Sequence, residues 1–155
     1  MKPPDWLARG SPWVWAQNFL TLAVLALGPV LRSQQSHRPG IVAGALLLGA
    51  GALFGVAGVR ALGRNRTPFP KPREDARLVE HGIFSIVRHP LYTSLCLISI
   101  GWALLWWSGP ALVAALALAM LLDAKARLEE SWLRELFPNY DAYARRVRRL
   151  IPGVY

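Results

Sequence analysis

Residues 91–122 read LYTSLCLISIGWALLWWSGPALVAALALAMLL, a run of 32 positions without a charged side chain. A helix that crosses a bilayer needs about 20 residues, so the run is too long for a single membrane helix. Ser108-Gly109-Pro110 interrupts it, and Gly-Pro is a strong turn signal. The run therefore predicts two transmembrane helices, residues 91–107 and 111–128, that form a tight hairpin.

Two further blocks of the chain are apolar. Residues 12–31 and 41–59 carry no charge, which predicts one transmembrane helix over 12–31 and another over 41–61. The whole chain of 155 residues is 54% hydrophobic and yet has a net charge of +9. Apolar blocks in lipid and basic blocks at its edge reconcile these two values. The predicted fold class is an all-α integral membrane protein with about four transmembrane helices in a single domain, residues 1–155.

Basic residues are distributed unevenly between the loops. Seven of the 18 Lys and Arg lie between Arg60 and Arg88, seven follow from Lys125 onward, and none lies in the hairpin turn. Positive charge concentrates on the cytoplasmic side of membrane proteins. With both termini cytoplasmic, 16 of the 18 lie inside. Residues 62–90 are then a cytoplasmic loop, and residues 129–155 are a cytoplasmic tail with a helical extension.

A cleaved signal peptide is the alternative for residues 12–31, because Lys2 and Arg9 precede this apolar block. Gln17 and Asn18 inside the block, and the lack of a small-x-small cleavage site after it, favour a membrane helix. The single cysteine, Cys96, excludes an intramolecular disulfide and a cysteine-based metal cluster. We predict no metal site.

Two polar motifs flank the predicted hairpin: Arg88-His89-Pro90-Leu91-Tyr92 before it and Arg127-Leu128-Glu129-Glu130 after it. Tyr92 lies 17 residues before Gly109 and Lys125 lies 16 residues after it. At 1.5 Å per residue, both lie roughly 25 Å from the turn. The two arms should therefore return their polar ends to the same membrane face and form one site there.

The polar segments on this side have local patterns of their own. Prolines 68, 70 and 72 predict a loop over residues 62–77. A short turn at Gly82 should follow, and the helix from residue 111 should continue to about 136. Residues 140–147 can form a short amphipathic helix with Tyr140, Tyr143 and Val147 on one face.

Each motif also has a purely structural interpretation. Arg88 could be a positive anchor at the membrane surface. The pairs Asp123–Arg127 and Glu130–Arg134 have the spacing of ion pairs on a solvated helix face. The arginines of the tail could simply attract anionic lipid.

The order of the motifs is more specific than any one of them. LVEHGIFSIVRHPLYTSL (78–95), an apolar hairpin, ARLEESWL (126–133) and FPNYDAYARRVRRLIP (137–152) together resemble the isoprenylcysteine carboxyl methyltransferase family, in particular its prokaryotic members. The resemblance covers roughly residues 62–155. It implies an integral membrane enzyme that uses S-adenosylmethionine without a Rossmann domain. The expected location is the bacterial inner membrane.

The resemblance also implies roles for residues at the matching positions. Its catalytic residues are His89, Glu129 and Glu130. Lys125 and Arg127 are the residues that would face the substrate, Lys125 standing where eukaryotic members have an arginine. The implied cofactor-binding residues are Leu78, Val79, Gly82, Phe84, Arg88, His89, Pro90, Tyr92, Glu129 and Glu130.

The function implied is transfer of a methyl group to a lipophilic substrate at the boundary between membrane and cytoplasm. Carboxyl methylation of an isoprenylcysteine-like or prenylated substrate fits the resemblance best. Two alternatives stay open, namely N- or S-methylation of a lipid or small molecule, and a non-enzymatic membrane protein with a degenerate site. The expected partners are membrane lipid and a lipophilic substrate, and no nucleic acid. The identity of the methyl acceptor and the oligomeric state are left open by the sequence.

Overall fold

The structure is a computed structural model that describes residues 10–34, 37–72 and 76–155. Lys2, Arg9 and Arg73, which enter the charge count above, lie outside the described residues. No described residue belongs to a strand, so the predicted all-α class is confirmed. The helices are α2 (Ser11–Val30), α3 (Arg38–Leu62), η1 (Gly63–Asn65), η2 (Gly82–Ser85), α4 (Pro90–Leu105), α5 (Gly109–Leu136) and α6 (Tyr140–Arg146).

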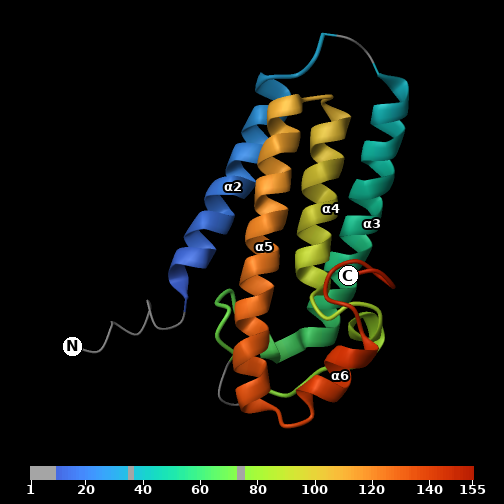
Figure 1. Cartoon of the computed structure of the whole chain (residues 1–155). Coiled ribbons are helices and arrows are strands. Elements are labelled where there is room, and N and C mark those ends of the chain that lie inside the picture. Colours follow the sequence, from blue (N-terminus) through green and yellow to red (C-terminus); the bar gives the residue numbers. More distant parts are fainter. Residues whose placement is uncertain (1–9, 35–36, 73–75) are drawn as a thin grey trace, which may run out of the picture.

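The four long helices lie side by side in the order α2, α5, α4 and α3 (Figure 1). Helix α4 packs against α3, α5 and α2, which makes it the central element of the bundle. Helix α6 and the last residues lie at the end opposite the α4–α5 turn (Figure 1). We call this the polar end, and it comprises α5 from Lys125 onward, η2, α6 and residues 147–155.

Two of the described helices, α2 and α3, are long and apolar enough to cross a membrane. Their outward faces carry large apolar side chains, for example Phe19 (71% exposed) on α2 and Leu53 (73% exposed) on α3. Exposed apolar surface of this extent is unusual for a protein in water and suits contact with lipid tails. Helix α4 is apolar but has only 16 residues.

The α4–α5 turn does not lie where the sequence predicts it. The predicted turn is Ser108-Gly109-Pro110, but α4 already ends at Leu105 and the chain reverses at Trp106 and Trp107, with Trp107 at φ 50°. Gly109 and Pro110 instead form the first turn of α5, where a missing N–H group costs nothing. Ser108 caps this helix by accepting a hydrogen bond from the Ala111 N–H (3.3 Å).

Helices α3 and α4 approach each other until their backbones touch. A Cβ atom on Gly44 would lie 2.7 Å from the carbonyl oxygen of Gly101, and one on Gly101 would lie 2.8 Å from that of Gly44. Two helical turns further along α3, the Ser94 hydroxyl donates to the Gly51 carbonyl (2.7 Å). Small residues that allow this approach are typical of helix pairs in membranes.

Helix α2 is tied to the hairpin through a defect in its own hydrogen bonding. Pro29 has no N–H group, so the Leu25 carbonyl loses its helical partner. The Trp102 indole of α4 donates to that carbonyl (3.3 Å), and the Ser108 hydroxyl donates to the Leu27 carbonyl (3.1 Å). The end of α2 is therefore held against the α4–α5 turn.

At the polar end, the last residues of the chain run along the segment that precedes α4. The Arg88 N–H donates to the Arg148 carbonyl (2.8 Å), and the His89 N–H donates to the Arg149 carbonyl (3.1 Å). The Thr93 hydroxyl donates to the Leu150 carbonyl (2.7 Å). This pairing fixes the position of the Arg88-His89-Pro90 segment.

Helix α6 packs under the same segment. Tyr140, Tyr143 and Val147 are buried together, on the face that their spacing predicts. The Tyr143 hydroxyl donates to the Phe84 carbonyl in η2 (2.7 Å). Gly82 begins η2 at φ 62°, so the predicted turn at this residue takes the form of a short 3₁₀ helix.

The α3–α4 contact gives a stability prediction. Gly44→Ala should lower the free energy of unfolding by about 1–3 kcal/mol, because the added methyl group meets backbone that cannot move without separating the helices. Gly49→Ala on the same helix is the matched control, since nothing lies within 4 Å of its Cβ position. It should leave stability unchanged or raise it by up to about 1 kcal/mol. Denaturant unfolding in detergent, followed by circular dichroism, measures both. Equal losses in the two variants would contradict the close contact.

Candidate active site

The centre of the polar end is the carboxylate of Glu130, whose side chain is fully buried (0% exposed). Its Oε1 atom accepts hydrogen bonds from Arg88 Nε (3.0 Å), Arg88 Nη2 (2.8 Å) and Arg149 Nε (2.9 Å). Arg149 Nη2 donates to Oε2 (3.1 Å), and His89 Nε2 lies 3.2 Å from Oε1. Burial alone would raise the pKa of Glu130, but the hydrogen bonds from His89, Arg149 and Arg88 outweigh it and hold this pKa well below its usual value.

Arg88 links three parts of the chain. Besides its bonds to Glu130 on α5, its Nη1 atom donates to the Ala144 carbonyl (2.9 Å) in α6 and to the Val147 carbonyl just after it. The side chain is only 8% exposed. Arg88 is therefore a buried structural cation rather than a simple anchor at the membrane surface.

The neighbouring carboxylate, Glu129, has different surroundings. Its Oε2 atom accepts a hydrogen bond from the Tyr92 hydroxyl (2.8 Å) and lies 3.7 Å from His89 Nδ1. The side chain is 26% exposed. The His89 ring thus lies between the two carboxylates, with one nitrogen toward each.

A small cavity of about 90 Å³ opens beside Glu129. Its walls include His89 and Arg88, the segment at Leu78 and Val79, aromatic residues of η2 and α6, and Phe137 between α5 and α6. The residues that line it are Leu62, Asn65, Thr67, Pro72, Ala76, Arg77, Leu78, Val79, Phe84, Arg88, His89, Glu129, Leu133, Phe137, Tyr140 and Tyr143.

One wall of this cavity carries an unsatisfied polar group. The hydroxyl of Tyr140 is buried and makes no hydrogen bond within the described part of the chain. Burial, with the charge of Glu130, raises the pKa of Tyr140, so the hydroxyl keeps its proton. A buried hydroxyl without a partner is costly, which suggests that a ligand in the cavity would bind it.

The structure divides the cofactor-binding residues expected from the sequence into two groups. Leu78, Val79, Phe84, Arg88, His89 and Glu129 line the cavity. Gly82, Pro90, Tyr92 and Glu130 do not. Gly82 and Pro90 set the start of η2 and of α4, Tyr92 bonds to Glu129, and Glu130 holds the arginines.

Lys125, a predicted substrate residue, is almost fully buried (2% exposed) and does not line the cavity. Its Nζ atom donates to Gln17 Oε1 of α2 (2.7 Å) and to the Pro68 carbonyl (3.3 Å). It also lies 5.2 Å from the centre of the Tyr92 ring. Lys125 thus joins α5 to α2 and to the proline-rich segment that contains prolines 68, 70 and 72.

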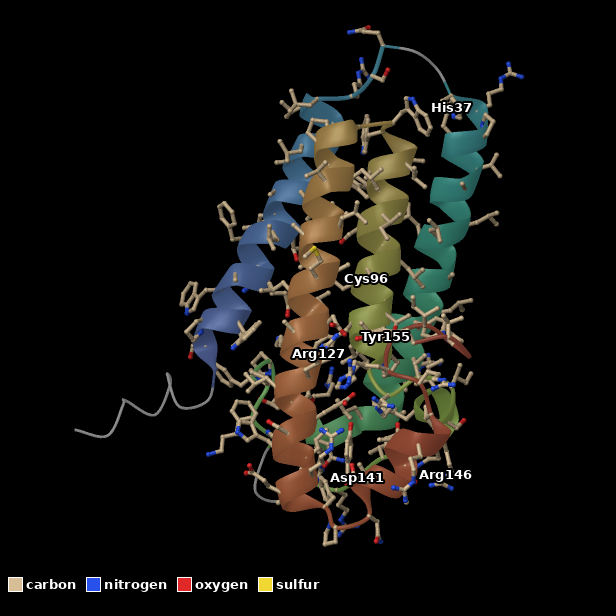
Figure 2. The ribbon with its side chains drawn as sticks, viewed as in Figure 1. His37, Cys96, Arg127, Asp141, Arg146 and Tyr155 are labelled. Atoms are coloured by element: carbon tan, nitrogen blue, oxygen red, sulfur yellow. The ribbon has the colours of Figure 1, made fainter. Side chains whose placement is uncertain are left out.

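Arg127, the other predicted substrate residue, does not line the cavity either, and its side chain is 62% exposed. It pairs with Asp123 (2.8 Å), one helical turn earlier, and with the hydroxyl of Tyr155 (2.6 Å). The two labelled side chains Arg127 and Tyr155 lie near each other (Figure 2). The two predicted substrate residues are thus not brought together.

Three residues of the site were missed by sequence reasoning. Arg149 belongs to a run of arginines that looked like a lipid-facing patch, and nothing in its spacing indicates a bond to Glu130. The Gln17 side chain, a polar group in an apolar helix, was a signal of a buried partner. The spacing of Tyr140 indicated packing, but not its unsatisfied hydroxyl.

Two curated relatives match 81 residues of this chain at 36% identity. They are the cobalt-zinc-cadmium resistance protein of Cupriavidus metallidurans and the nickel-cobalt-cadmium resistance protein of Alcaligenes xylosoxydans xylosoxydans. Each match covers 52% of this chain and 38% of the relative, so the chain spans well under half the length of these relatives.

The sequence model of the phospholipid methyltransferase family matches residues 39–140. The match begins in α3 and ends at the start of α6, so it includes α4, α5 and both carboxylates of the site. This confirms the membrane methyltransferase family expected from the sequence motifs. The chain belongs to the phospholipid methyltransferase family.

Proposed function

We propose that this protein transfers a methyl group from S-adenosylmethionine to a lipophilic acceptor at the membrane surface. Membership of a methyltransferase family supports the activity and the cofactor in general terms. The observation that carries the proposal is the cavity beside Glu129, with apolar walls, one exposed carboxylate and the unpartnered hydroxyl of Tyr140. It lies at the end of an apolar hairpin, where a water-soluble cofactor and a lipid-soluble acceptor can meet.

The residues around the cavity fit the parts of S-adenosylmethionine. Phe84, Leu133 and Phe137 offer apolar surface for the adenine ring. The Glu129 carboxylate suits the ammonium group, and the Tyr140 hydroxyl can donate to a carboxylate or ribose oxygen. The cavity is smaller than the roughly 300–1,000 Å³ of typical ligand sites. Binding therefore requires the cavity to widen.

The protein's own contribution to the reaction is mainly positioning. When bound, the cofactor supplies a methyl group already activated by its sulfonium, so the chain must align the acceptor with it and exclude water. Glu130 with its two arginines keeps His89 in place. His89 and Glu129 are the groups near enough to take a proton from an acceptor that carries one.

Within this proposal, the acceptor is an isoprenylcysteine-like carboxylate, as the motif resemblance implies. A carboxylate is ionised at neutral pH and needs no base. Lys125 is the cation proposed to bind it, which requires Nζ to exchange its bond to Gln17 for one to the substrate. Because Lys125 already has partners in the chain, a lipid amine or thiol acceptor is the second candidate.

We further propose four membrane spans, formed by α2, α3, α4 and α5, with both termini in the cytoplasm of a bacterial cell. The uneven distribution of the basic residues, 16 of 18 on one side, supports this orientation. Helix α4 has 16 residues and a length of about 24 Å. It can serve as a short span because α3 and α5 cover it.

The two carboxylates should respond differently to removal of their charge. Glu129→Gln should weaken S-adenosylhomocysteine binding about tenfold or more, because a charge-assisted contact contributes about 1.5–3 kcal/mol, and should leave the melting temperature unchanged. Glu130→Gln should cost about 3–5 kcal/mol of stability, because it leaves buried arginines without their partner. Calorimetry and thermal unfolding in detergent measure the two effects. The assignments would be contradicted if Glu129→Gln bound S-adenosylhomocysteine as tightly as wild type does. They would also be contradicted if Glu130→Gln were as stable as wild type.

The stability supplied by Glu130 should also depend on pH. Its pKa is lower in the folded protein than in the unfolded chain, so its contribution is complete above the ordinary glutamate value of about 4.3 and decreases as the pH falls below that value. Melting temperatures between neutral and acidic pH should show this loss in the wild type and not in Glu130→Gln. Parallel curves for the two proteins would contradict it.

The chemistry of the methylated product separates the two acceptor classes. With an isoprenylcysteine-like acceptor, the product should be a methyl ester that base hydrolyses. Lys125→Met should then raise the KM for the acceptor about ten- to a hundredfold and leave the affinity for S-adenosylhomocysteine unchanged. A base-stable product together with an unchanged KM would rule out the carboxylate and assign an amine or thiol acceptor.

The topology can be tested by cysteine labelling in a Cys96→Ser background. A cysteine in place of Arg145 should react with an impermeant reagent only from the cytoplasmic side, and one in place of Gly109 only from the opposite side. Labelling of both positions from one side would contradict the hairpin of two membrane spans.

A further inference from the structure

Arg127 lies outside the cavity, on α5, and its side chain is exposed. Its guanidinium is fixed by two hydrogen bonds, from Nε to Asp123 Oδ2 (2.8 Å) and from Nη2 to the Tyr155 hydroxyl (2.6 Å). Its Nη1 group makes no hydrogen bond within the described part of the chain, and the side chain is 62% exposed. Arg127 is thus held in one orientation with a donor group left over.

An apolar stripe on α5 leads directly to this arginine. Val113, Leu116 and Met120 are 69%, 51% and 75% exposed. Their spacings of three and four residues continue through Asp123 to Arg127, so all lie on one face of the helix. From Val113 to Arg127 the helix rises about 21 Å, which exceeds the roughly 15 Å of hydrocarbon in one leaflet. A lipid tail along this stripe would bring its headgroup to Arg127.

The charges around Arg127 leave an excess of one cation. Arg149 Nη1 bonds to the Tyr155 hydroxyl (2.9 Å) and to Asp123 (3.3 Å), and Arg149 and Arg88 share Glu130. Arg134 also lies 3.7 Å from Glu130 and pairs with Asp141, so the four arginines of this group face three carboxylates, those of Asp123, Glu130 and Asp141. Because Arg88 and Arg149 are largely buried and Arg127 is exposed, the unbalanced positive charge is available at Arg127.

We propose that Arg127 and the stripe Val113, Leu116 and Met120 bind an anionic phospholipid, with the lipid phosphate on Nη1 of Arg127. This lipid is a bound structural lipid and not the methyl acceptor, because its site lies outside the cavity that is proposed for methyl transfer. The charge and the exposed donor select a phosphate, and the apolar stripe selects a lipid over a free phosphate. The site is independent of the proposed enzymatic activity.

The test uses the full chain in nanodiscs of phosphatidylcholine mixed with phosphatidylglycerol, without cofactor or acceptor. Native mass spectrometry of the released protein counts the lipids that stay bound. Wild type should retain phosphatidylglycerol in preference to phosphatidylcholine, and Arg127→Gln should lower this preference about ten- to a hundredfold. Since no methyl transfer is measured, the result does not depend on whether the proposed function is correct.

Arg145→Gln is the matched control, because it removes the same charge from an exposed position at the same end of the molecule. It should lower the preference by no more than about fivefold, the effect of one charge near an anionic surface. If Arg127→Gln and Arg145→Gln lose the same amount of lipid preference, the effect comes from the general charge of the surface. This result would overturn the proposal. Binding of inorganic phosphate is measured by calorimetry on wild type in phosphatidylcholine nanodiscs. If phosphate binds as tightly as phosphatidylglycerol does, the proposal is also overturned.

The stripe itself provides a second variant. Met120→Gln keeps the size of the side chain and makes its tip polar, so it should weaken lipid retention while Arg127 stays in place. A dimer that persists without anionic lipid and is lost in Met120→Gln would assign the stripe to a second copy of the chain and would overturn the lipid site.

Discussion

The buried carboxylate of Glu130 is the interaction on which the polar end of this protein depends. Arg88 and His89, which precede α4, and Arg149 of the tail converge on it. Removing an ionised carboxylate from water costs several kcal/mol, which these bonds must offset. The main result of the network is therefore geometrical, because it fixes α5, the segment before α4 and the tail in one arrangement.

Within that arrangement, two adjacent residues of α5 have different tasks. Glu130 is fully buried and satisfied by the protein, whereas Glu129 is partly exposed and borders the cavity. Successive residues on a helix point about 100° apart, so one can face the network while the other faces a ligand. His89 lies between them and connects the structural group to the group available for binding.

The rest of the bundle supports this end by holding α4 in place. Backbone contact with α3 at Gly44 and Gly101, and the Trp102 bond to the carbonyl left free by Pro29, position α4 on both sides. Lys125 and Gln17 then join α5 and α2 to the proline-rich segment that borders the cavity. The apolar helices thereby determine where the polar site lies.

The sequence by itself determined the all-helical class, the apolar blocks and the neighbourhood of Arg88-His89-Pro90 with Glu129-Glu130, because hydrophobicity and helical rise act along the chain. It placed the hairpin turn two residues too late, since Gly-Pro is equally suited to the first turn of a helix. Only the tertiary structure decided that Arg149 joins Glu130, that Lys125 is bound by Gln17 and that Arg127 faces outward. These partners lie 19 and 108 residues apart in the first two cases, and no local pattern encodes a contact between side chains that only packing brings together.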